Sequence, residues 1–287
     1  MKLFVTGATG FVGSHFVRAA LAAGHEVVGL RHREQSRPRI ELLMEPRWLD
    51  KPMTDITAAD LVGCDALVHL AAHTPNVPYD TLESCLHWNL IVPLEVFRDA
   101  HRAGVERFVV AGSCFEYGRA GERYEFIPPD APLEPTLSYP TSKAAASIAF
   151  KSFAAETGVR LSIHRIFQVF GEGESENRLW PALRRAALAG EDFSLSPGEQ
   201  VRDFIPVEEV AAALLDACTG LEVEPGIARI LNLGTGQPQT VRQFAERWWA
   251  KWNATGKLLF GTQAYRPGEV MRYVPLVDSS TSARHAE

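Results

Sequence analysis

The sequence has few cysteines and no long apolar run. Its 287 residues include four cysteines, Cys64, Cys85, Cys114 and Cys218, which lie far apart and form no CxxC pair. We interpret them as reduced thiols, which favours a cytoplasmic protein. No apolar stretch approaches the ~20 residues of a membrane-spanning helix, and the opening MKLFVTGATG does not resemble a signal peptide. We therefore expect no membrane partner.

Basic residues are not in excess either. The formal net charge of −6 argues against a general binder of nucleic acid. It does not exclude a phosphorylated ligand, because a few local arginines can outweigh the overall balance. His69 and His73 are four residues apart but flank the end of an expected strand without a third ligand, so we expect no metal site.

Short apolar runs alternate with helical stretches along the chain. We expect strands at residues 3–6, 26–30, 66–70, 107–111 and 160–166, and helices at 11–23, 79–103 and 141–156. Short, nearly all-apolar strands separated by helices are typical of a parallel sheet covered on both faces. The fold class predicted is therefore α/β with a doubly wound parallel sheet.

Three glycines follow the first expected strand. Gly7, Gly10 and Gly13 in GxxGxxG spacing permit a tight turn, a close approach of backbone N–H groups to a pyrophosphate, and close packing of the next helix. A simple tight turn is the alternative, but the position between strand and helix favours a dinucleotide site. The expected cofactor contacts in this turn are Gly7, Thr9, Gly10, Phe11, Val12 and Gly13.

The second expected strand ends in Leu-Arg-His-Arg, where sites for NAD usually carry an acidic residue. Arg31 and Arg33 stand where a 2′-phosphate would bind, so the predicted cofactor is NADP(H), with NAD(H) as second choice. The alternative is an ordinary solvated basic loop. Asp50 is a further candidate, for a contact with the adenine.

A tyrosine and a lysine four residues apart, Tyr139 and Lys143, share one helix face. We expect Pro140 to exclude Tyr139 from the helix and to start the helix behind it. The Lys143 ammonium and an oxidised nicotinamide are expected to lower the phenol pKa from ~10, which suits a general acid or base. Ser113, at the end of a preceding strand, can hold a carbonyl oxygen.

These segments together resemble the extended short-chain dehydrogenase/reductase family, in particular its nucleotide-sugar branch. The resemblance spans nearly the whole chain, through TGATGFVGSH, HLAA, GSCFEYG, YPTSK, QVRDFIPVEEV and YRPGEV. It implies the reductive triad Ser113, Tyr139 and Lys143. It implies cofactor contacts from Leu70, Ala71, Ala72, Asn89, Tyr139 and Lys143, and substrate contacts from Ser113, Cys114, Phe115, Asn177, Arg202 and Arg266. Trp180 is a candidate for stacking on the nucleotide base.

The polar segment 171–200 and the chain after Pro238 interrupt the alternation of strands and helices. We predict an NADP-binding Rossmann domain of residues 1–169 and about 203–236. A smaller substrate-binding lobe would comprise residues about 170–202 and 237–287. By analogy with the family, helices 79–103 and 141–156 would pair in a homodimer.

Departures from the family pattern narrow the reaction. The 4,6-dehydratases of the family carry an acidic pair where this chain has Cys114 and Phe115, so dehydration is disfavoured. Glu116 replaces a more common apolar residue, and either a substrate contact or an exposed charge at a strand end would account for it. Gln168 stands where asparagine or tyrosine is commoner, which leaves that contact open.

The predicted function is NADPH-dependent reduction of the 4-keto group of a nucleotide-linked 4-keto-6-deoxyhexose, in deoxysugar biosynthesis. The partner is then a nucleotide-diphosphate sugar, whose nucleoside and C4 stereochemistry the sequence does not name. One alternative is an NAD-dependent 4-epimerase that uses the same triad. An alternative of another class is a non-catalytic protein that senses NADP(H).

Overall fold

A seven-stranded parallel sheet forms the centre of the molecule in the computed structural model, which describes residues 1–220, 222–265 and 269–277. The strand order is β11-β6-β5-β4-β1-β2-β3. The strands are β1 (Lys2–Thr6), β2 (Glu26–Arg31), β3 (Arg47–Asp50), β4 (Ala66–His69), β5 (Arg107–Ser113), β6 (Arg160–Ile166) and β11 (Arg229–Leu233). The chain builds outward from β1 in both directions, which confirms the doubly wound α/β fold.

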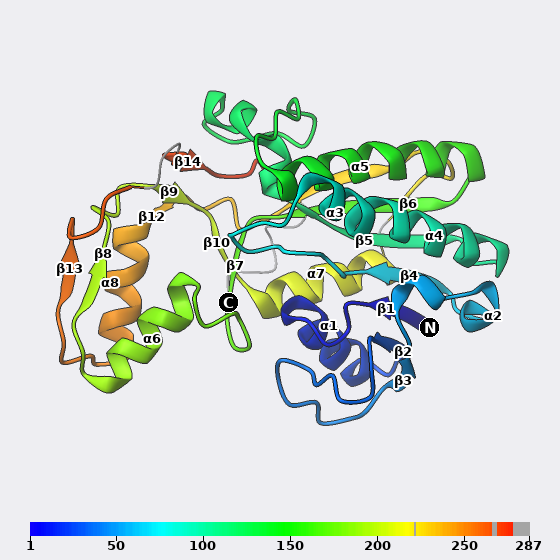
Figure 1. The fold of residues 1–287 in the computed structure, drawn as a ribbon, viewed down its shortest axis with the longest axis horizontal. Coiled ribbons are helices and arrows are strands. Elements are labelled where there is room, and N and C mark those ends of the chain that lie inside the picture. Colours follow the sequence, from blue (N-terminus) through cyan, green and yellow to red (C-terminus); the bar gives the residue numbers. More distant parts are fainter. Residues whose placement is uncertain (221, 266–268, 278–287) are drawn as a thin grey trace.

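Helices cover both faces of this sheet (Figure 1). The helices are α1 (Phe11–Ala22), α2 (Ala58–Leu61), α3 (Leu82–Leu86), α4 (Val92–Arg102), α5 (Ser138–Thr157), α6 (Leu179–Ala189), α7 (Val207–Thr219) and α8 (Val241–Lys251). On one face α1 and α7 pack side by side, and Phe16 and Leu214 join a core cluster with Leu3 of β1. On the other face Phe97 of α4 and Phe150 of α5 lie 4.6 Å apart, ring centre to ring centre, above the sheet.

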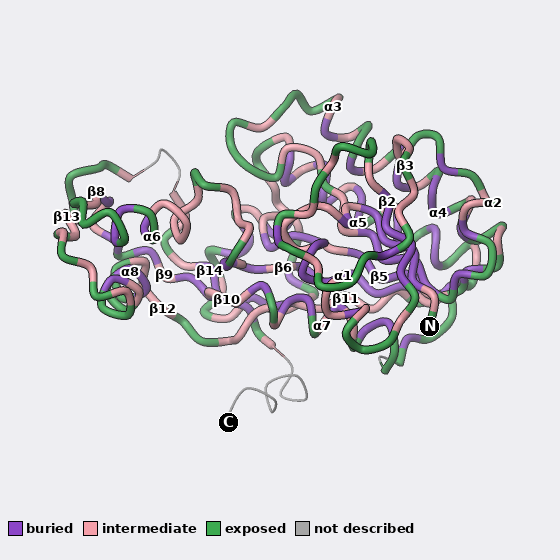
Figure 2. The backbone as a smooth tube through the Cα atoms, turned by 90° about the horizontal axis from the view of Figure 1, so that it is seen from below, coloured by how far each residue is buried: buried purple, intermediate pink, exposed green. Residues whose placement is uncertain are grey.

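Burial follows this layering (Figure 2). The central strands are almost wholly buried, as expected for a parallel sheet between two helical layers. At ~25 cal/mol per Å² of apolar surface, these two clusters provide most of the driving force for folding. The carboxyl ends of β1, β4 and β5 all point toward the same edge, where functional groups of such a sheet gather.

A smaller lobe lies beyond that edge. α6 and α8 pack together through Leu183, Ala245 and Trp249. The short strands around and beside them are β7 (Gln168–Phe170), β8 (Phe193–Leu195), β9 (Val201–Arg202), β10 (Phe204–Pro206), β12 (Gln239–Thr240), β13 (Leu258–Phe260) and β14 (Arg272–Tyr273). The chain enters this lobe after β7, returns to the sheet through β10, α7 and β11, and enters it again at β12. The exact domain boundaries stay a prediction.

Two expected helices differ from the observed ones. The stretch predicted as one helix over 79–103 consists of α3, a π-helical turn at His87–Ile91, and α4. α5 begins at Ser138, so Tyr139 lies inside the helix and the expected exclusion by Pro140 is wrong. Thr141 N–H donates to Leu137 C=O at 2.9 Å, and Pro140 falls in the first turn, where N–H groups have no partner within the helix.

None of the helices in the described ranges is both long enough and apolar enough to cross a membrane.

Candidate active site

The glycine turn between β1 and α1 has no room for side chains. Gly7 has a φ of +70°, and a Cβ there would lie 2.5 Å from the backbone nitrogen of Ala71. A Cβ on Gly13 would lie 2.0 Å from the carbonyl oxygen of Gly7. Gly10, the residue before α1, provides no side-chain cap. The first N–H groups of α1 are therefore free to bind a phosphate, with the helix dipole in support.

Ser113, Tyr139 and Lys143 converge at the ends of β5 and α5. A side-chain hydrogen bond joins Ser113 to Tyr139. The Ser113 hydroxyl also accepts the N–H of Phe115 at 3.3 Å, which fixes its place at the strand end. Lys143 Nζ donates to the carbonyl oxygen of Ala111 at 2.7 Å, so the ammonium lies beside the same strand. All three side chains are buried.

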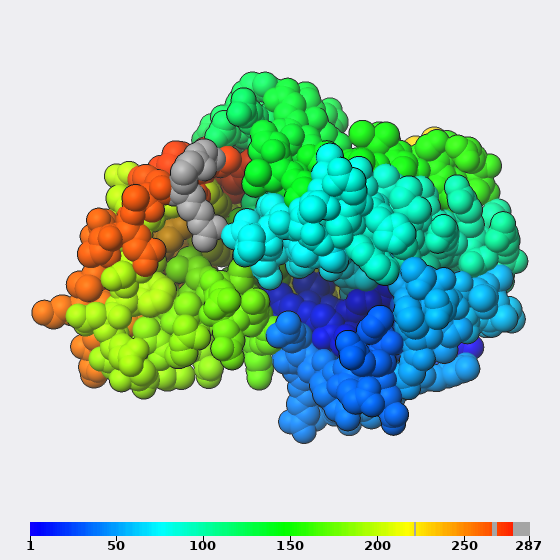
Figure 3. Space-filling view, viewed as in Figure 1, coloured from blue at the N-terminus to red at the C-terminus, as the bar shows by residue number. Residues whose placement is uncertain are grey.

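A cleft of about 550 Å³ brings the turn and these three residues together. It opens where the N-terminal segment meets the segments after β4 and β6 (Figure 3). The predicted site residues that line it are Gly7, Thr9, Gly10, Phe11, Val12, Gly13, Leu70, Ala71, Ala72, Ser113, Cys114, Phe115, Tyr139 and Lys143. One cleft therefore contains both the turn that would bind a dinucleotide phosphate and the phenol of Tyr139.

Burial raises the pKa of Tyr139 above its usual value of 10, and the negative charge of Glu116 adds to the rise. The hydrogen bond from Ser113 opposes it. Burial also lowers the pKa of Lys143, whereas Glu116 raises it. The lowered phenol pKa expected from the sequence is thus wrong for the chain itself, because desolvation of the phenolate exceeds the favourable contacts. The positive charge of an oxidised nicotinamide was the second factor expected to lower this pKa, and it acts only when the cofactor is bound.

The family model described as the NAD dependent epimerase/dehydratase family matches residues 3–234. The chain belongs to this family. The match covers the whole of the glycine turn, the Ser113 strand and the Tyr139 helix. The resemblance read from the sequence is therefore confirmed at the level of the extended nucleotide-sugar family.

Named relatives cover most of the chain. It is 29% identical over 267 residues to a UDP-glucose 4-epimerase of Corynebacterium glutamicum, which covers 86% of this chain and 79% of that protein. It is 22% identical over 276 residues to a CDP-abequose synthase of Salmonella muenchen, covering 94% and 87%. Among solved structures, MoeE5 in complex with UDP-glucose and NAD is 26% identical with a TM-score of 0.81, covering 98% of this chain and 91% of that one.

The residues predicted to select the cofactor lie outside the cleft lining of this epimerase/dehydratase family member. Arg31 at the end of β2 forms a two-pronged ion pair with Asp50 at the end of β3, and its guanidinium lies 5.0 Å from the Trp48 ring centre. Arg33 is exposed. Arg39, which the sequence reading missed, does line the cleft.

Asn89 is buried behind the cleft rather than in it. Its Oδ1 accepts the N–H of His73 at 2.7 Å, and its Nδ2 donates to the Ser142 hydroxyl at 3.0 Å. It lies in the π-helical turn and ties the loop after β4 to α5. Asn89 therefore holds together segments beside the cleft and does not line the cleft itself. His69 is likewise a buried structural residue, 2.8 Å from the Thr6 hydroxyl, and burial lowers its pKa to about 3.

The predicted substrate contacts separate into two groups. Cys114 and Phe115 line the cleft beside Ser113. Asn177 is exposed and does not, but its neighbour Arg178 does. The sequence contained a reason to consider Arg178, because it is a cation in the polar segment 171–200. Asn177 was predicted instead because it matched the family pattern better.

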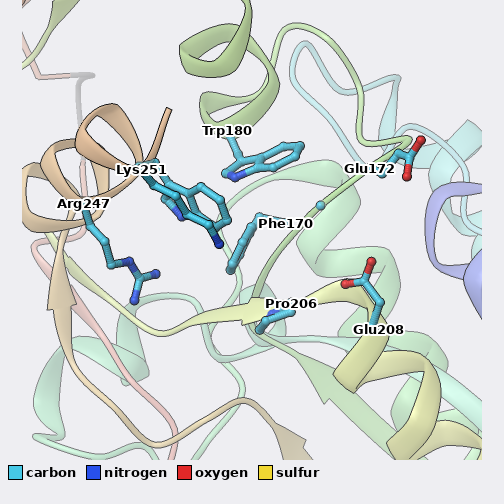
Figure 4. A pocket seen from close by; sticks show the side chains of 9 residues that line it. Phe170, Glu172, Trp180, Pro206, Glu208, Arg247 and Lys251 are labelled. Atoms are coloured by element: carbon cyan, nitrogen blue, oxygen red, sulfur yellow. The ribbon is translucent and has the colours of Figure 1, made fainter. Parts of the chain in front are cut away.

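Trp180 lies in a second pocket of about 470 Å³, between the lobe and the start of α7 (Figure 4). Its ring meets those of Phe170, Trp248 and Trp252 at 5.5–6.1 Å. The structure therefore places it in an aromatic cluster of the lobe, away from the lining of the main cleft.

Arg202 on β9 is nearly buried and donates to Glu269 at 2.7 Å. It does not line the cleft. Arg266 lies outside the described residues.

Glu116 takes neither role left open by the sequence. It is wholly buried, and its carboxylate accepts hydrogen bonds from Ser147 at 2.7 Å and from Arg165 Nε at 2.8 Å. It is therefore neither exposed nor part of the cleft lining. The sequence offered no sign of this pair, because its members are 49 positions apart.

Glu174 is a titratable cleft residue that the sequence reading missed. It lines the cleft with Gln168 and Arg178. Its Oε1 accepts from Arg178 Nε at 3.1 Å, while its buried Oε2 has no hydrogen-bond partner among the described residues. Burial raises its pKa to about 7 against the influence of Arg178.

No group of three or more His, Cys, Asp or Glu side chains that could hold a metal ion occurs in the part of the chain that the structure describes.

Proposed function

We propose that the protein reduces the 4-keto group of a nucleotide-linked 4-keto-6-deoxyhexose with NADPH. The observation that supports this most strongly is the cleft itself, which holds a glycine turn for a dinucleotide and the hydrogen-bonded pair Ser113 and Tyr139. A relative named CDP-abequose synthase aligns over 94% of the chain, which supports a nucleotide-sugar substrate.

In this reaction a bound nicotinamide supplies the hydride to C4 of the sugar. Tyr139 donates its proton to the oxygen that would otherwise become an alkoxide. The Ser113 hydroxyl binds the same oxygen and orients it. Lys143 lies one helical turn from the phenol, where its ammonium stabilises the phenolate that remains after proton transfer.

The residues after Ser113 support reduction over dehydration. Neither Cys114 nor Phe115 carries an acid, and burial raises the pKa of the Cys114 thiol to about 12. A thiol with that pKa stays protonated near neutral pH and is a poor base. Glu116, the next residue, is held in its ion pair with Arg165.

The assay that tests this function uses a panel of nucleotide-linked 4-keto-6-deoxyhexoses with NADPH. Consumption of NADPH with formation of a C4 alcohol, identified by NMR, is the expected result. Failure of every substrate in the panel to consume NADPH would contradict the proposal.

We propose NADP(H) as the cofactor because Arg31 and Arg33 stand at and just after the end of β2, where a 2′-phosphate would bind, and Arg39 lines the cleft. Two nitrogens of Arg31 already donate to Asp50, so a 2′-phosphate would compete with that carboxylate. Steady-state kinetics with NADPH and NADH measure the preference directly. A higher kcat/KM with NADH would overturn this part of the proposal.

A 4-epimerase is the second candidate, favoured by the alignment with a UDP-glucose 4-epimerase over 86% of the chain. The same triad would serve an epimerase, which retains its NAD through the cycle. Stoichiometric NAD in the purified protein, with interconversion of C4 epimers and no net NADPH consumption, would favour this candidate. A non-catalytic sensor would be favoured instead if Tyr139→Phe left the biological activity intact.

For the nucleotide diphosphate we propose Arg178, from its position in the cleft, together with Arg202 and Arg266 from the family resemblance. Arg178→Ala should raise KM for the nucleotide sugar more than it changes KM for NADPH. Arg184→Ala, at an exposed position of α6 that does not line the cleft, is the matched control and should leave both KM values unchanged.

We further propose a homodimer formed by the helical segment 79–103, which comprises α3, the π-helical turn and α4, and by α5. Trp88 and Ile91 of the π-helical turn and Ile148 of α5 are exposed and could contact a partner there. Light scattering should give twice the chain mass, and Ile148→Glu should give the monomer. A monomeric wild type would contradict the proposal.

A further inference from the structure

Glu116 is a buried carboxylate to which the proposed reaction assigns no role. Its Oε1 accepts the backbone N–H of Ser113 at 2.8 Å. Its Oε2 accepts from Ser147 and Arg165, so both oxygens are occupied. The side chain has no exposed surface, and Arg165 is itself nearly buried. An isolated buried carboxylate would be very unfavourable, so the pair exists only as a unit.

The surroundings are shaped to admit this carboxylate. A Cβ on Gly112 would lie 2.9 Å from Glu116 Oε1, so a larger residue there would crowd the carboxylate. Arg165 is anchored in turn by the carbonyl oxygen of Pro129 at 2.8 Å and by the Tyr117 ring, 4.6 Å from its guanidinium carbon. The carboxylate is therefore fixed from three sides.

The groups that Glu116 binds are neighbours of the catalytic ones. Ser113 carries the hydroxyl that meets the phenol, and Glu116 holds the backbone of the same residue. Ser147 lies one turn beyond Lys143 on α5, so Tyr139, Lys143 and Ser147 share one helix face. One carboxylate thus joins the end of β5 to the helix that carries the phenol and the ammonium.

We propose that Glu116, anchored by Arg165, is a positioning residue that holds Ser113 against Tyr139. The inference rests on the proposed function in so far as that function uses this pair. It applies equally to reduction and to epimerisation, because both need the serine and the phenol.

The carboxylate also acts through its charge. Its negative charge raises the pKa of both Tyr139 and Lys143. Tyr79 and Cys114 also raise the pKa of the phenol, whereas Ser113 lowers it. The ammonium of Lys143 lies one turn further along α5. Removal of the charge at position 116 should therefore shift ionisation of Tyr139 to lower pH.

The first experiment separates positioning from folding. Glu116→Val removes the acceptor for Ser113 N–H and leaves Arg165 unpaired, so Tm should fall by roughly 5–10 °C. The double variant Glu116→Val/Arg165→Met removes both charges, and Tm should recover. We expect kcat to stay about 10–100-fold below wild type in both variants, because misplacement of the serine is not repaired. KM for the nucleotide sugar should change by less than about threefold, since no cleft side chain is removed.

The activity measured is the one that the wild-type protein shows, ketoreduction or epimerisation, and Tyr139→Phe reports that the triad is used. If kcat returns with Tm in the double variant, or if Glu116→Val is fully active while Tyr139→Phe is inactive, the positioning role is wrong. Neither result would bear on the proposed function.

The second experiment needs no turnover. The tyrosinate absorbance of the protein with bound NADP⁺ is titrated in wild type and in Glu116→Gln, each minus its Tyr139→Phe counterpart. Glutamine keeps an acceptor for Ser113 N–H and removes the charge, so the Tyr139 step should move to lower pH. Ser147→Ala, which keeps the charge, should leave the step in place. An unmoved step in Glu116→Gln would contradict the electrostatic part of the proposal.

Discussion

Most of the groups around the Tyr139 hydroxyl favour the neutral, protonated phenol. Burial, Glu116, Tyr79 and Cys114 all raise its pKa, and the Ser113 hydrogen bond opposes them. A phenol of this kind is a proton donor in the reductive direction. Its ionisation then depends on the positive charge that an oxidised nicotinamide brings next to it.

Replacement of Tyr139 by phenylalanine tests this residue directly. Tyr139→Phe should lower kcat by about 10²–10⁴-fold, the usual contribution of a general acid. The phenyl ring keeps the packing against Tyr79, whose ring centre is 5.4 Å away, so Tm and the affinity for NADPH should change little. Steady-state kinetics and fluorescence titration with NADPH measure both. An unchanged kcat would remove the phenol from the mechanism.

Glu174 predicts a pH dependence of stability. Its pKa is about 7 in the folded protein, against a usual value of 4.5. Between pH 4.5 and pH 7, the Glu174 carboxyl is therefore protonated in the folded state and ionised in the unfolded state. The free energy of unfolding should fall as pH rises through this window, by up to about 3 kcal/mol. Urea unfolding at several pH values between 4 and 8 measures it.

Glu174→Gln is the matched variant, because glutamine has nearly the same shape and cannot ionise. Its unfolding free energy should lack that part of the pH slope. An equal slope in both proteins would show that other groups cause it.

The sequence predicted the role of a residue best where that role depends on residues close to it in the chain. The glycine turn and the spacing of Tyr139 and Lys143 are local, and the structure places these side chains in one cleft. The pKa of Tyr139 depends on burial and on partners far along the chain, which no local pattern reports. The bond between Glu116 and the Ser113 N–H is a local capping box with the pattern S-x-x-E, but the burial of Glu116 and its pairing with Arg165 are not local.

At the scale of elements, five of the seven parallel strands could be predicted because each is a short apolar run between helices. The two edge strands, β3 and β11, were not among the expected ones. The boundaries of two helices could not. Pro140 was expected to precede its helix, but the first turn of α5 tolerates it. The π-helical turn at His87–Ile91 inserts an extra residue per turn and places Asn89 inward, next to Ser142. Hydrophobic spacing alone does not distinguish such a turn from regular helix.

The turn between β1 and α1 gives a prediction at this scale. Gly13→Ala should abolish NADPH binding and lower Tm, because its Cβ would overlap the carbonyl oxygen of Gly7 and force the helix away from the strand. Gly24→Asn is the control. Gly24 has a positive φ, of +80°, which asparagine tolerates, and no atom lies within 4 Å of its Cβ position. NADPH titration and thermal unfolding compare the two. Normal binding by Gly13→Ala would contradict the assigned role of this turn.

At the scale of the whole molecule, the layered sheet followed from composition and alternation. The position of the lobe did not, because it depends on how the chain returns to the sheet. The sequence reading therefore assigned Trp180 to the nucleotide, whereas the packing of α6 on α8 places it in an aromatic cluster. Arg178, two residues earlier, lies before the start of α6 and reaches the cleft.

That return path has a consequence for synthesis on the ribosome. α7, which covers α1 and one face of the sheet, ends at residue 219, and the edge strand β11 follows it. Until those residues emerge, α1 alone covers that face, and the cluster of Leu3, Val5 and Phe16 lacks the side chains that α7 contributes. We expect a nascent chain arrested near residue 169 to bind chaperones and to aggregate when released, whereas one arrested well beyond 233 should resist protease. Protein made from its first half alone would thus be a client of the cell's quality control and not a smaller enzyme.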